Sequence, residues 1–235
     1  MQLFYNSLIT AADKQFAFDK IESKHIIRVL RKKAGDTLFI TNGKGLFFTA
    51  EINIASDKNC VVTLILAEEK PKPWPYYLHI AIAPTKNNDR FEWFLEKATE
   101  IGIDEITPII CARSERKVVK LERFQKIIES AAKQSLKYHF PKLNSPVSFD
   151  HFVNSQVAGQ LFIAHCEELE RKSLQSQLKP SEKTCVLIGP EGDFSIQEIE
   201  KALANNFAPV LLGASRLRTE TAGVVATHTV ALMNT

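Results

Sequence analysis

The sequence of 235 residues has little cysteine and no long apolar run. Its four cysteines are far apart and form no C-x-x-C pair, a pattern that argues against a zinc site and even more against a disulfide framework. No apolar stretch reaches the ~18 residues that a membrane-spanning helix needs. The first residues lack the basic start and long apolar stretch of a signal peptide. We therefore expect a cytoplasmic protein with reduced thiols and no membrane association.

Several common catalytic motifs are also missing. The six histidines form no H-x-x-x-H or H-E-x-x-H pair, so we expect no metal centre. The chain has no G-x-S-x-G elbow, no P-loop and no G-x-G-x-x-G fingerprint. These absences disfavour a serine hydrolase and a phosphoryl-transfer enzyme.

The chain has little net charge, because its 30 Lys and Arg are nearly balanced by 27 Asp and Glu. The excess of +3 is unevenly placed: residues 1–72 carry 11 basic and 8 acidic residues, whereas residues 73–235 carry 19 of each. Basic residues concentrate at 20–44, with seven against two acidic ones, and at 113–142, with nine against three. Phosphate backbones bind such clusters, so the distribution is compatible with a nucleic-acid partner that the net charge alone does not indicate.

The clearest boundary in the chain is a run of alternating prolines. Pro71, Pro73 and Pro75 cannot continue a helix or a central strand, so the segment is predicted to be a stiff, extended linker. It divides the chain into a first domain at 1–72 and a second at 73–235.

The first domain is predicted to be a small β-barrel. Its β-branched and aromatic runs indicate strands, and Asn42-Gly43-Lys44-Gly45 has the composition of a hairpin turn. One helix is predicted over His25–Lys33, with Ser23 as its N-cap. The predicted strands are 37–41, 46–54 and 60–67.

The second domain alternates short apolar runs with helical periods, which predicts an α/β domain. Nearly all-apolar strands suit a parallel sheet covered on both faces. The predicted strands are 78–83, 106–110, 161–164, 185–189 and 210–213, and the predicted helices are 90–101, 121–137 and 224–233.

Helix ends in this domain are also marked in the sequence. Gly102 is placed to end the first helix as a C-cap, and Ser195 with Glu198 forms a capping box that opens a further helix. Thr219 or Thr221 is expected to cap the last helix.

Two segments that follow predicted strands have the residues to hold a ligand. The loop at 188–195 has two glycines and a proline, which allow a close approach of backbone to a ligand, although a plain strand-to-helix turn has the same composition. The segment at 211–223 places Arg216, Arg218 and Glu220 beyond a strand's carboxyl end, where open α/β sheets bind ligands. Arg218 and Glu220 would also suit a surface ion pair of little energy.

Two basic features complete the candidates. The segment at 84–92 combines basic groups with a helix N-terminus, a natural anion site, in which Asn88 or Asp89 would also serve as a plain N-cap. The helix predicted before the linker puts basic residues on one broad side, which suits either a phosphate backbone or an ordinary solvated face. These basic residues are Lys24, Arg28, Arg31 and Lys32.

The order of the motifs is more specific than any one of them. A strand-rich first part with H-I-I-R-V-L-R at 25–31 precedes five further motifs. They are R-F-E-W-F-L-E-K-A-T-E-I-G-I-D-E-I-T-P (90–108), R-S-E-R-K (113–117), K-Q-S-L-K (133–137), I-G-P-E-G-D-F-S (188–195) and L-G-A-S-R-L-R-T-E-T-A (212–222). In this order they resemble the bacterial 16S ribosomal RNA uridine-N3 methyltransferases, the RsmE-type branch of the SPOUT superfamily.

This resemblance implies a fold, a cofactor and partners. The first 72 residues would form a PUA-like RNA-binding domain, and residues 73–235 a SPOUT methyltransferase domain whose parallel sheet ends in a C-terminal trefoil knot. S-adenosylmethionine would bind in the knot, and the enzyme would act as a homodimer with each active site at the subunit interface. Its substrate would be 16S ribosomal RNA of the small subunit.

The resemblance also implies site residues. Arg218 would stabilise the charge that develops on uracil O2 and O4, and Glu220 would either accept the N3 proton or orient Arg218, with orientation favoured because an Arg-paired carboxylate is a weak base. The cofactor residues would be His165, Ile188, Gly189, Pro190, Gly192, Leu212, Gly213, Leu217, Arg218 and Thr219. The RNA-binding residues would be Lys24, His25, Arg28, Arg31, Lys32, Lys86, Arg90, Arg113, Lys117 and Lys137.

Three positions depart from the pattern of the family. The fifth residue of the glycine loop is Asp193 in place of glycine, and Ser215 stands where an arginine is frequent, with Arg216 one residue later. Lys137 stands where an arginine is common, which retains the charge but not the bidentate fork.

Two other functions remain open at this stage. One is a different SPOUT reaction, such as 2′-O-methylation of RNA, which shares fold and cofactor but needs another base pocket. The other is a non-catalytic RNA-binding factor for ribosome assembly, against which the intact L-R-T-E-T-A stretch at 217–222 argues.

Overall fold

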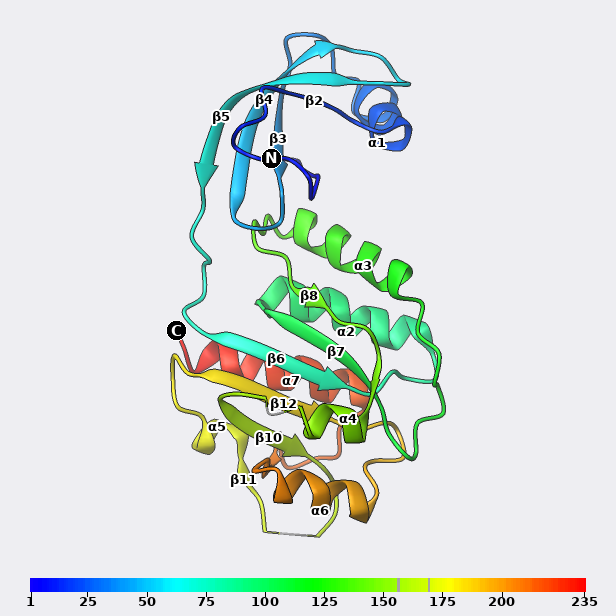
Figure 1. Ribbon diagram of the computed structural model, residues 1–235, viewed down its shortest axis with the longest axis vertical. Helices are drawn as coiled ribbons and strands as arrows, with labels where there is room; N and C mark the ends of the chain where they lie inside the picture. The colour runs from blue at the N-terminus through cyan, green and yellow to red at the C-terminus, as the bar shows by residue number, and fades with distance from the viewer. Residues whose placement is uncertain (156, 169) are drawn as a thin grey trace. The chain divides into compact units, whose positions relative to one another are not determined.

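The computed structural model describes residues 1–155, 157–168 and 170–235 (Figure 1). These residues form two compact units. The first unit contains Met1–Pro73 and Ala132–Phe140, and the second contains Trp74–Ala131 and Pro141–Thr235. The chain thus leaves the first unit within the proline-rich segment and contributes a short stretch to it again later. No helix among the described residues is long and apolar enough to cross a membrane.

The first unit is built on a five-stranded sheet. Its buried core includes Phe4, Ile26, Ile40 and Phe48, and the strands predicted at 37–41 and 46–54 are confirmed, with β-branched and aromatic side chains packed on the pleated surface. In sheet order, the strands are β1 (Leu3–Tyr5), β3 (Thr37–Thr41), β4 (Leu46–Ile54), β5 (Val61–Glu69) and β2 (Gln15–Ala17).

The helix of this unit begins earlier than the sequence predicts. It comprises α1 (Lys20–Lys24) and a π-helical turn η1 (His25–Val29), and its N-cap is Asp19, whose carboxylate accepts a hydrogen bond from Glu22 N. The prediction of Ser23 as the N-cap is therefore wrong. Ser23 is buried, and its hydroxyl donates to Phe18 O and accepts from Cys60 N, so it bridges the helix to two other segments.

Residues 132–140 complete the first unit. Gly45 N donates to Tyr138 O at 2.8 Å and Phe140 N donates to Gly43 O at 2.9 Å, and the ring of Phe140 stacks on Tyr5. Gly43 has a φ of +71°, a conformation that a glycine adopts without strain. The hairpin predicted at 42–45 is thus present, and its turn is covered by a segment from far along the chain.

The second unit contains one parallel sheet, as predicted. Every strand pair in it is parallel. In sheet order the strands are β11 (Lys172–Ser173), β13 (Ala208–Leu211), β10 (Gln160–Ala164), β12 (Lys183–Ile188), β6 (Tyr77–Ile82), β7 (Glu105–Ile110) and β8 (Lys142–Leu143), with β9 (Val147–Ser148) also paired to β7.

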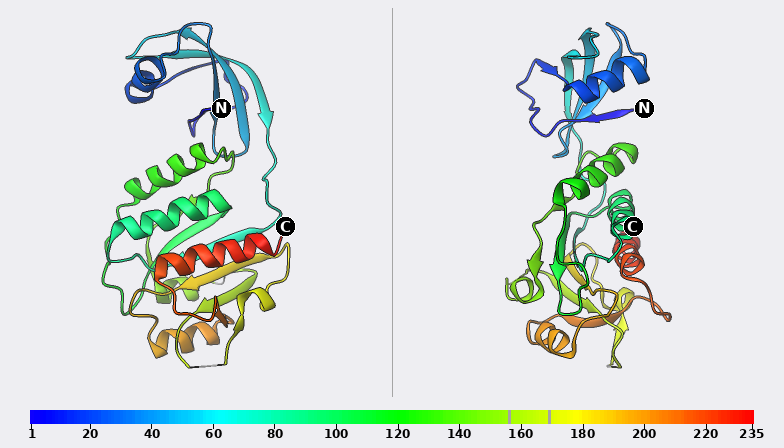
Figure 2. Two further views of the ribbon diagram at one scale, coloured as in Figure 1. Left: turned by 180° about the vertical axis from the view of Figure 1, so that it is seen from behind. Right: turned by 90° about the vertical axis from the view of Figure 1, so that its right-hand side faces the viewer.

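Helices cover both faces of this sheet (Figure 2). Leu78, Ile80 and Ile82 of β6 belong to a core that includes residues of α2 and α7, whereas Ala81 and Ala83 belong to a second core with residues of α4 and α6. The alternation of one strand between two apolar cores explains its unbroken apolar sequence. The helices are α2 (Asn88–Ile101), α3 (Leu121–Gln134), α4 (Phe149–Val153), α5 (Leu174–Gln177), α6 (Ile196–Ala204) and α7 (Thr219–Leu232).

The helix ends agree with the sequence in two of four cases. Gly102 is the C-cap of α2, with a φ of +127°, and Ser195 and Glu198 form the capping box of α6. The N-cap of α2 is Asn87, not Asn88 or Asp89, because Asn87 is the residue whose side chain accepts from the helix. Helix α7 begins at Thr219 and has Arg218 at its N-cap position without a side-chain cap, so the expected threonine cap is wrong.

Candidate functional site

The site lies where neighbouring parallel strands end. Strand β10 lies between β12 and β13 in the sheet. Both of these strands follow β10 in the chain, so the chain adds a strand first on one side of β10 and later on its other side. The carboxyl ends of these strands lead into the segments at 165–168, 189–195 and 212–218. Open α/β sheets bind ligands at such a switch point.

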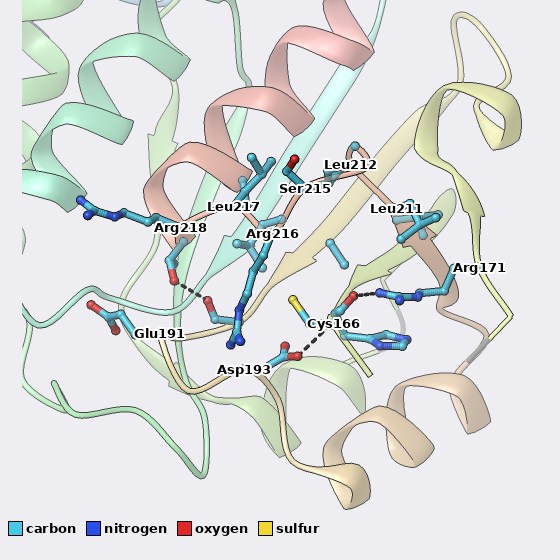
Figure 3. Close-up of a pocket in the computed structure, with 18 of the residues that line it drawn as sticks. Cys166, Arg171, Glu191, Asp193, Leu211, Leu212, Ser215, Arg216, Leu217 and Arg218 are labelled. Carbon is cyan, nitrogen blue, oxygen red and sulfur yellow. Dashed lines mark hydrogen bonds between the residues drawn. The ribbon is translucent and has the colours of Figure 1, made fainter. Parts of the chain in front are cut away.

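These segments enclose a cavity of about 500 Å³ (Figure 3). The structure brings nine of the ten predicted cofactor residues to its wall: His165, Ile188, Gly189, Pro190, Leu212, Gly213, Leu217, Arg218 and Thr219. Gly192 does not line this cavity. It packs instead against Arg113, where an added Cβ would lie 3.3 Å from the arginine Cβ.

Asp193 ties the loop after β12 to the end of β10. Its backbone has a φ of +63°, a left-handed conformation that glycine adopts freely and aspartate tolerates better than most residues. One carboxylate oxygen accepts from Cys166 N at 2.7 Å and the other from Phe194 N at 2.9 Å. The departure from glycine at this position therefore adds a hydrogen bond at the cavity wall.

A second set of contacts fixes the same loop from outside. The guanidinium of Arg113 donates to Gly192 O at 3.0 Å and to Phe194 O at 3.2 Å. Glu191 accepts from Lys86 N at 2.9 Å through one carboxylate oxygen, while its other oxygen is buried and has no partner among the described residues. The structure thus gives Arg113 a role in supporting the loop, whereas the sequence predicted it to bind RNA.

Thr219 joins the two main loops of the cavity. Its buried hydroxyl donates to Gly189 O at 3.0 Å, so the start of α7 is held against the end of β12. The hydroxyl of Thr219 therefore binds the loop after β12 and does not cap its own helix. Because α7 starts here, its first unpaired backbone N–H groups lie at the cavity, where they favour a negatively charged or polar group.

His165 is a buried polar residue in the wall of this cavity. It is 5% exposed, and neither ring nitrogen has a partner among the described residues. Burial lowers the pKa of His165, and the neighbouring Arg171 lowers it further, so the ring is neutral at pH 7 and offers one donor and one acceptor. The guanidinium of Arg171 also donates to His165 O.

Several residues of this wall were missed in the sequence, among them the charged Arg171 and Asp193. Arg171 lies in a stretch without a recognisable pattern, and nothing in the sequence marks it. Asp193 had a usable signal, because an aspartate in a glycine position indicates a left-handed turn with a side chain that can bond nearby backbone.

A second cavity of about 610 Å³, which is more open to solvent, adjoins the first. Both cavities have Arg216, Leu217 and Arg218 in their walls, so ligands bound in the two would meet at this segment. The other residues of the second wall are Asp89, Arg90, Trp93, Glu220 and Thr221.

The two predicted catalytic residues lie in this second wall, but they are not paired. Glu220 is 6% exposed, and its Oε1 lies 3.9 Å from Nε of Arg90. Its Oε2 is buried and has no hydrogen-bond partner among the described residues. The surface ion pair between Arg218 and Glu220 that the sequence left open is absent from the described part of the chain.

The predicted RNA-binding residues are divided between the two units. In the first unit, Lys24, Arg28 and Arg31 are exposed, but the guanidinium of Arg28 is already paired with Asp57. His25 lies 3.5 Å from Glu22. Lys32 is partly exposed, and Lys137 is half-buried, with its pKa lowered by burial.

The remaining basic residues lie on the second unit. Lys86 forms an exposed ion pair with Glu115 at 2.8 Å, which raises the pKa of the lysine. Lys117 is exposed. Within the described residues, no group of three or more His, Cys, Asp and Glu is arranged to hold a metal ion, and all four cysteines are free.

Comparison with known proteins agrees with this geometry. The model of an RNA methyltransferase domain matches residues 72–231, and that of an RNA methyltransferase PUA domain matches residues 18–65. A protein from Synechocystis named ribosomal RNA small subunit methyltransferase E is 31% identical over 86% of this chain and 68% of its own length. This chain belongs to the ribosomal RNA small subunit methyltransferase E family. The family expected from the motifs is therefore confirmed.

Further members and structures extend the match over the whole chain. The methyltransferase E of Buchnera aphidicola is 31% identical over 90% of this chain and 86% of its own. A probable rRNA methyltransferase from Porphyromonas gingivalis has 43% identity and a TM-score of 0.93, and the alignment covers 100% of this chain and 98% of that one. A methyltransferase from Legionella pneumophila, solved with bound S-adenosylmethionine, has 29% identity and a TM-score of 0.87 over 97% and 96% of the two chains.

The residues of the first cavity fit the cofactor of this family. His165, whose imidazole has no partner among the described residues, lines this cavity together with apolar residues and loop backbone, and nothing lies within 4 Å of the position that a Cβ on Gly213 would occupy. S-adenosylmethionine combines an apolar and aromatic adenosine with polar and charged groups, and a mixed wall of this kind suits such a molecule.

Proposed function

We propose that this methyltransferase transfers a methyl group from S-adenosylmethionine to N3 of a uridine in 16S ribosomal RNA of the small subunit. The observation that carries the proposal is the pair of cavities that share the segment 216–218, in a chain that matches RNA methyltransferases over most of its length. One cavity is available for the methyl donor and the other for the acceptor.

The cofactor is assigned to the first cavity. When bound, S-adenosylmethionine supplies a methyl group on a positively charged sulfur. The nine predicted cofactor residues of that wall would hold it, together with Arg171 and Asp193. The bonds from Thr219 to Gly189 and from Asp193 to Cys166 keep the three loops in fixed positions, and such preorganisation supplies much of the rate in a group transfer that depends on alignment.

The chemistry of the acceptor is assigned to Arg218 and Glu220. Uracil N3–H is a weak acid whose anion carries charge on O2 and O4, and a guanidinium beside those oxygens stabilises that charge as it develops. Glu220 has a free, buried carboxylate oxygen and no bond to Arg218. This arrangement supports Glu220 as the acceptor of the N3 proton over the orienting role.

The remaining assignments complete the proposal. We assign residues 1–72 as the PUA-like RNA-binding domain and residues 73–235 as the methyltransferase domain, with a C-terminal trefoil knot around the cofactor, in a cytoplasmic homodimer. Residues 221–232 of α7 carry no Asp, Glu, Lys or Arg. An uncharged helix with exposed positions such as Leu232 supports a subunit contact.

The proposal is tested by methyl transfer onto small subunits isolated from a strain that lacks this protein, followed by nucleoside analysis. We expect 3-methyluridine as the product. A 2′-O-methylated nucleoside would indicate the other SPOUT reaction. An absence of product together with no measurable binding of S-adenosylmethionine by calorimetry would indicate a non-catalytic assembly factor.

Arg218→Ala separates catalysis from cofactor binding. We expect at least a tenfold loss of turnover at saturating S-adenosylmethionine, because one charge-stabilising donor contributes roughly 10²–10³ in comparable sites, and a smaller loss of cofactor affinity, because Arg218 is one of nine residues proposed to hold the cofactor. Single-turnover methylation measures the effect. An unchanged rate would remove Arg218 from this role.

A further inference from the structure

The second cavity has features that the general reaction leaves unexplained. It is lined by an exposed tryptophan, by three arginines and by a buried carboxylate with an unused oxygen. We propose that this cavity is the pocket for the target base, in which Trp93 stacks on the uracil ring and Glu220 accepts the hydrogen bond from N3–H. This inference rests on the proposed function and names the residues that select its substrate.

Trp93 is the first observation. Its relative exposure is 42%, whereas the other tryptophan of the chain, Trp74, is 7% exposed. Tryptophan side chains are on average highly buried in folded proteins. Trp93 lies on α2 beside Arg90, in the wall of a cavity, and an aromatic face among cations is the recurrent platform for a single unstacked base.

Glu220 is the second and independent observation. Its residue is more than nine-tenths buried, and Oε2 has no donor among the described residues. A buried acceptor without a partner costs about 1–3 kcal/mol, so a ligand that brings an N–H donor to this point gains stability. The contact of Oε1 with Arg90 at 3.9 Å is long and leaves the guanidinium able to bond a ligand as well.

The donors and acceptors of the wall match uracil. Arg90 and Arg218 offer N–H donors in this wall, and Glu220 offers an acceptor. Uracil presents one donor, N3–H, flanked by two acceptors, O2 and O4. Cytosine has no proton on N3 and carries an amino group in place of O4. It would therefore leave Glu220 without a hydrogen bond and place its amino donor against the N–H donors of an arginine. Such mismatches of buried polar groups give strong discrimination.

The position of the cavity fits the reaction. It shares the segment 216–218 with the cofactor cavity, so a base held there lies next to the methyl donor. A base reaches it only after leaving its stack, as enzymes that modify bases require.

The test compares Trp93→Ala, Trp93→Phe and a control, Ile196→Ala, which removes an exposed apolar side chain at 57% exposure outside both cavities. On small subunits, we expect Trp93→Ala to lower kcat/KM about 5- to 150-fold, the range that base–aromatic stacking supplies. Trp93→Phe should restore most of the loss, and Ile196→Ala should match the wild type. Cofactor affinity and subunit mass in solution should be unchanged in all three.

Two results would overturn the inference. One is a Trp93→Ala enzyme with unchanged kcat/KM, and the other is a loss that coincides with an equal loss of cofactor affinity or with dissociation of subunits, which would make Trp93 structural. In both cases the wild type still methylates the particle. Failure of the proposed function is distinct, because the wild type then transfers no methyl group.

Base selection is tested by competition. We expect uridine 5′-monophosphate to inhibit methyl transfer at least tenfold more strongly than cytidine 5′-monophosphate, and Trp93→Ala to weaken that inhibition. Equal inhibition by the two nucleotides, or no inhibition by either, would overturn the role of Glu220 as the acceptor of the hydrogen bond from N3–H.

Discussion

At the scale of single residues, one aspartate shows how a departure from a family pattern becomes part of a site. Asp193 occupies a left-handed conformation and bonds Cys166 N across the cavity wall. Glycine would adopt the left-handed conformation freely but could not accept the hydrogen bond from Cys166 N. Alanine would be strained in that conformation and could not accept the bond either. The conformation and the bond are therefore separable by substitution.

We expect cofactor affinity and thermal stability to follow the order wild type > Asp193→Asn > Asp193→Gly > Asp193→Ala. Asparagine tolerates the left-handed conformation but keeps only one of the two acceptor oxygens. Alanine loses about 1 kcal/mol for the hydrogen bond and about 1–2 kcal/mol for the backbone. Calorimetric titration with S-adenosylmethionine and thermal unfolding measure the series. An alanine variant that equals the wild type in both measurements would contradict it.

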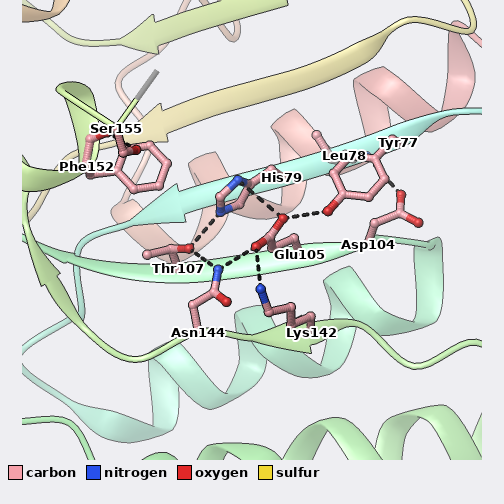
Figure 4. Close-up of polar contacts among 10 residues, drawn as sticks. All are labelled: Tyr77, Leu78, His79, Asp104, Glu105, Thr107, Lys142, Asn144, Phe152 and Ser155. Carbon is pink, nitrogen blue, oxygen red and sulfur yellow. Dashed lines mark hydrogen bonds and ion pairs between the residues drawn. The ribbon is translucent and has the colours of Figure 1, made fainter. Parts of the chain in front are cut away.

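At the scale of elements, neighbouring strands carry a polar cluster inside an otherwise apolar sheet (Figure 4). Glu105 of β7 accepts from Tyr77 at 2.5 Å and from Asn144 at 2.7 Å. His79 of β6, 8% exposed, lies 2.7 Å from the hydroxyl of Thr107 and 3.7 Å from Glu105. The cluster is satisfied by its own members, which is the condition for stable polar groups in a core.

This cluster predicts acid sensitivity. Burial lowers the pKa of His79. Burial alone would raise the pKa of Glu105, but the bonds from Asn144 and Tyr77 outweigh it and lower that pKa. In both cases the unfolded chain binds the proton more readily than the folded chain, so stability falls as pH decreases, below about 6.5 for the histidine and below about 4.3 for the glutamate.

We expect the denaturant midpoint of the wild type to fall between pH 7 and pH 5, and His79→Gln to reduce that slope. The glutamine keeps a polar group beside Thr107 but does not titrate. Urea unfolding at each pH is the measurement, with His151→Gln, a change at an exposed histidine, as the matched control. An identical slope in His79→Gln and wild type would contradict the assignment.

The basic helix of the first unit yields a second prediction at this scale. Arg28 is partly neutralised by Asp57, whereas Lys24 and Lys32 belong to no ion pair among the described residues. We expect Lys24→Glu with Lys32→Glu to weaken binding to the small subunit and to flatten its salt dependence, since each lost phosphate contact lowers the slope by about 0.7–0.9. Filter binding over a salt series measures both.

A matched control makes the same change of charge in the second unit, with Lys172→Glu and Lys179→Glu, both exposed. If the control and the test variant weaken binding equally, long-range charge explains the effect and the helix is an ordinary solvated face.

At the scale of the whole molecule, the sequence predicted the strands and helices better than the contacts between distant segments. The strands and their parallel sheet followed from apolar runs, and nine of the ten residues that the family resemblance predicted to bind the cofactor line one cavity. Arg171 was missed because no periodicity marks an irregular segment, and Ser23 was misplaced because a serine suits a cap and a buried bridge equally. Contacts between residues far apart in the sequence leave no local signal.

Residues 132–140 are the main example of such a contact. The proline linker predicts that the first domain ends at residue 72, yet this later segment belongs to the first unit. It supplies two backbone hydrogen bonds to the turn at 43–45 and an aromatic partner for Tyr5. His139 also lies 2.7 Å from Lys70 O. A fragment that ends at the linker therefore lacks part of its own packing.

We expect the fragment 1–73 to be about 2–4 kcal/mol less stable than the same fragment extended through a flexible linker by residues 132–140. Two backbone hydrogen bonds contribute about 1 kcal/mol each and a stacked aromatic pair about 0.5–1.5 kcal/mol. Urea unfolding followed by circular dichroism compares the two. In the extended fragment, Phe140→Ala should lose the share that comes from stacking on Tyr5, while an exchange at the exposed Gln134 should have no effect. If the short and extended fragments had the same free energy of unfolding, residues 132–140 would add no stability to the first unit. That result would show that the unit ends at the linker.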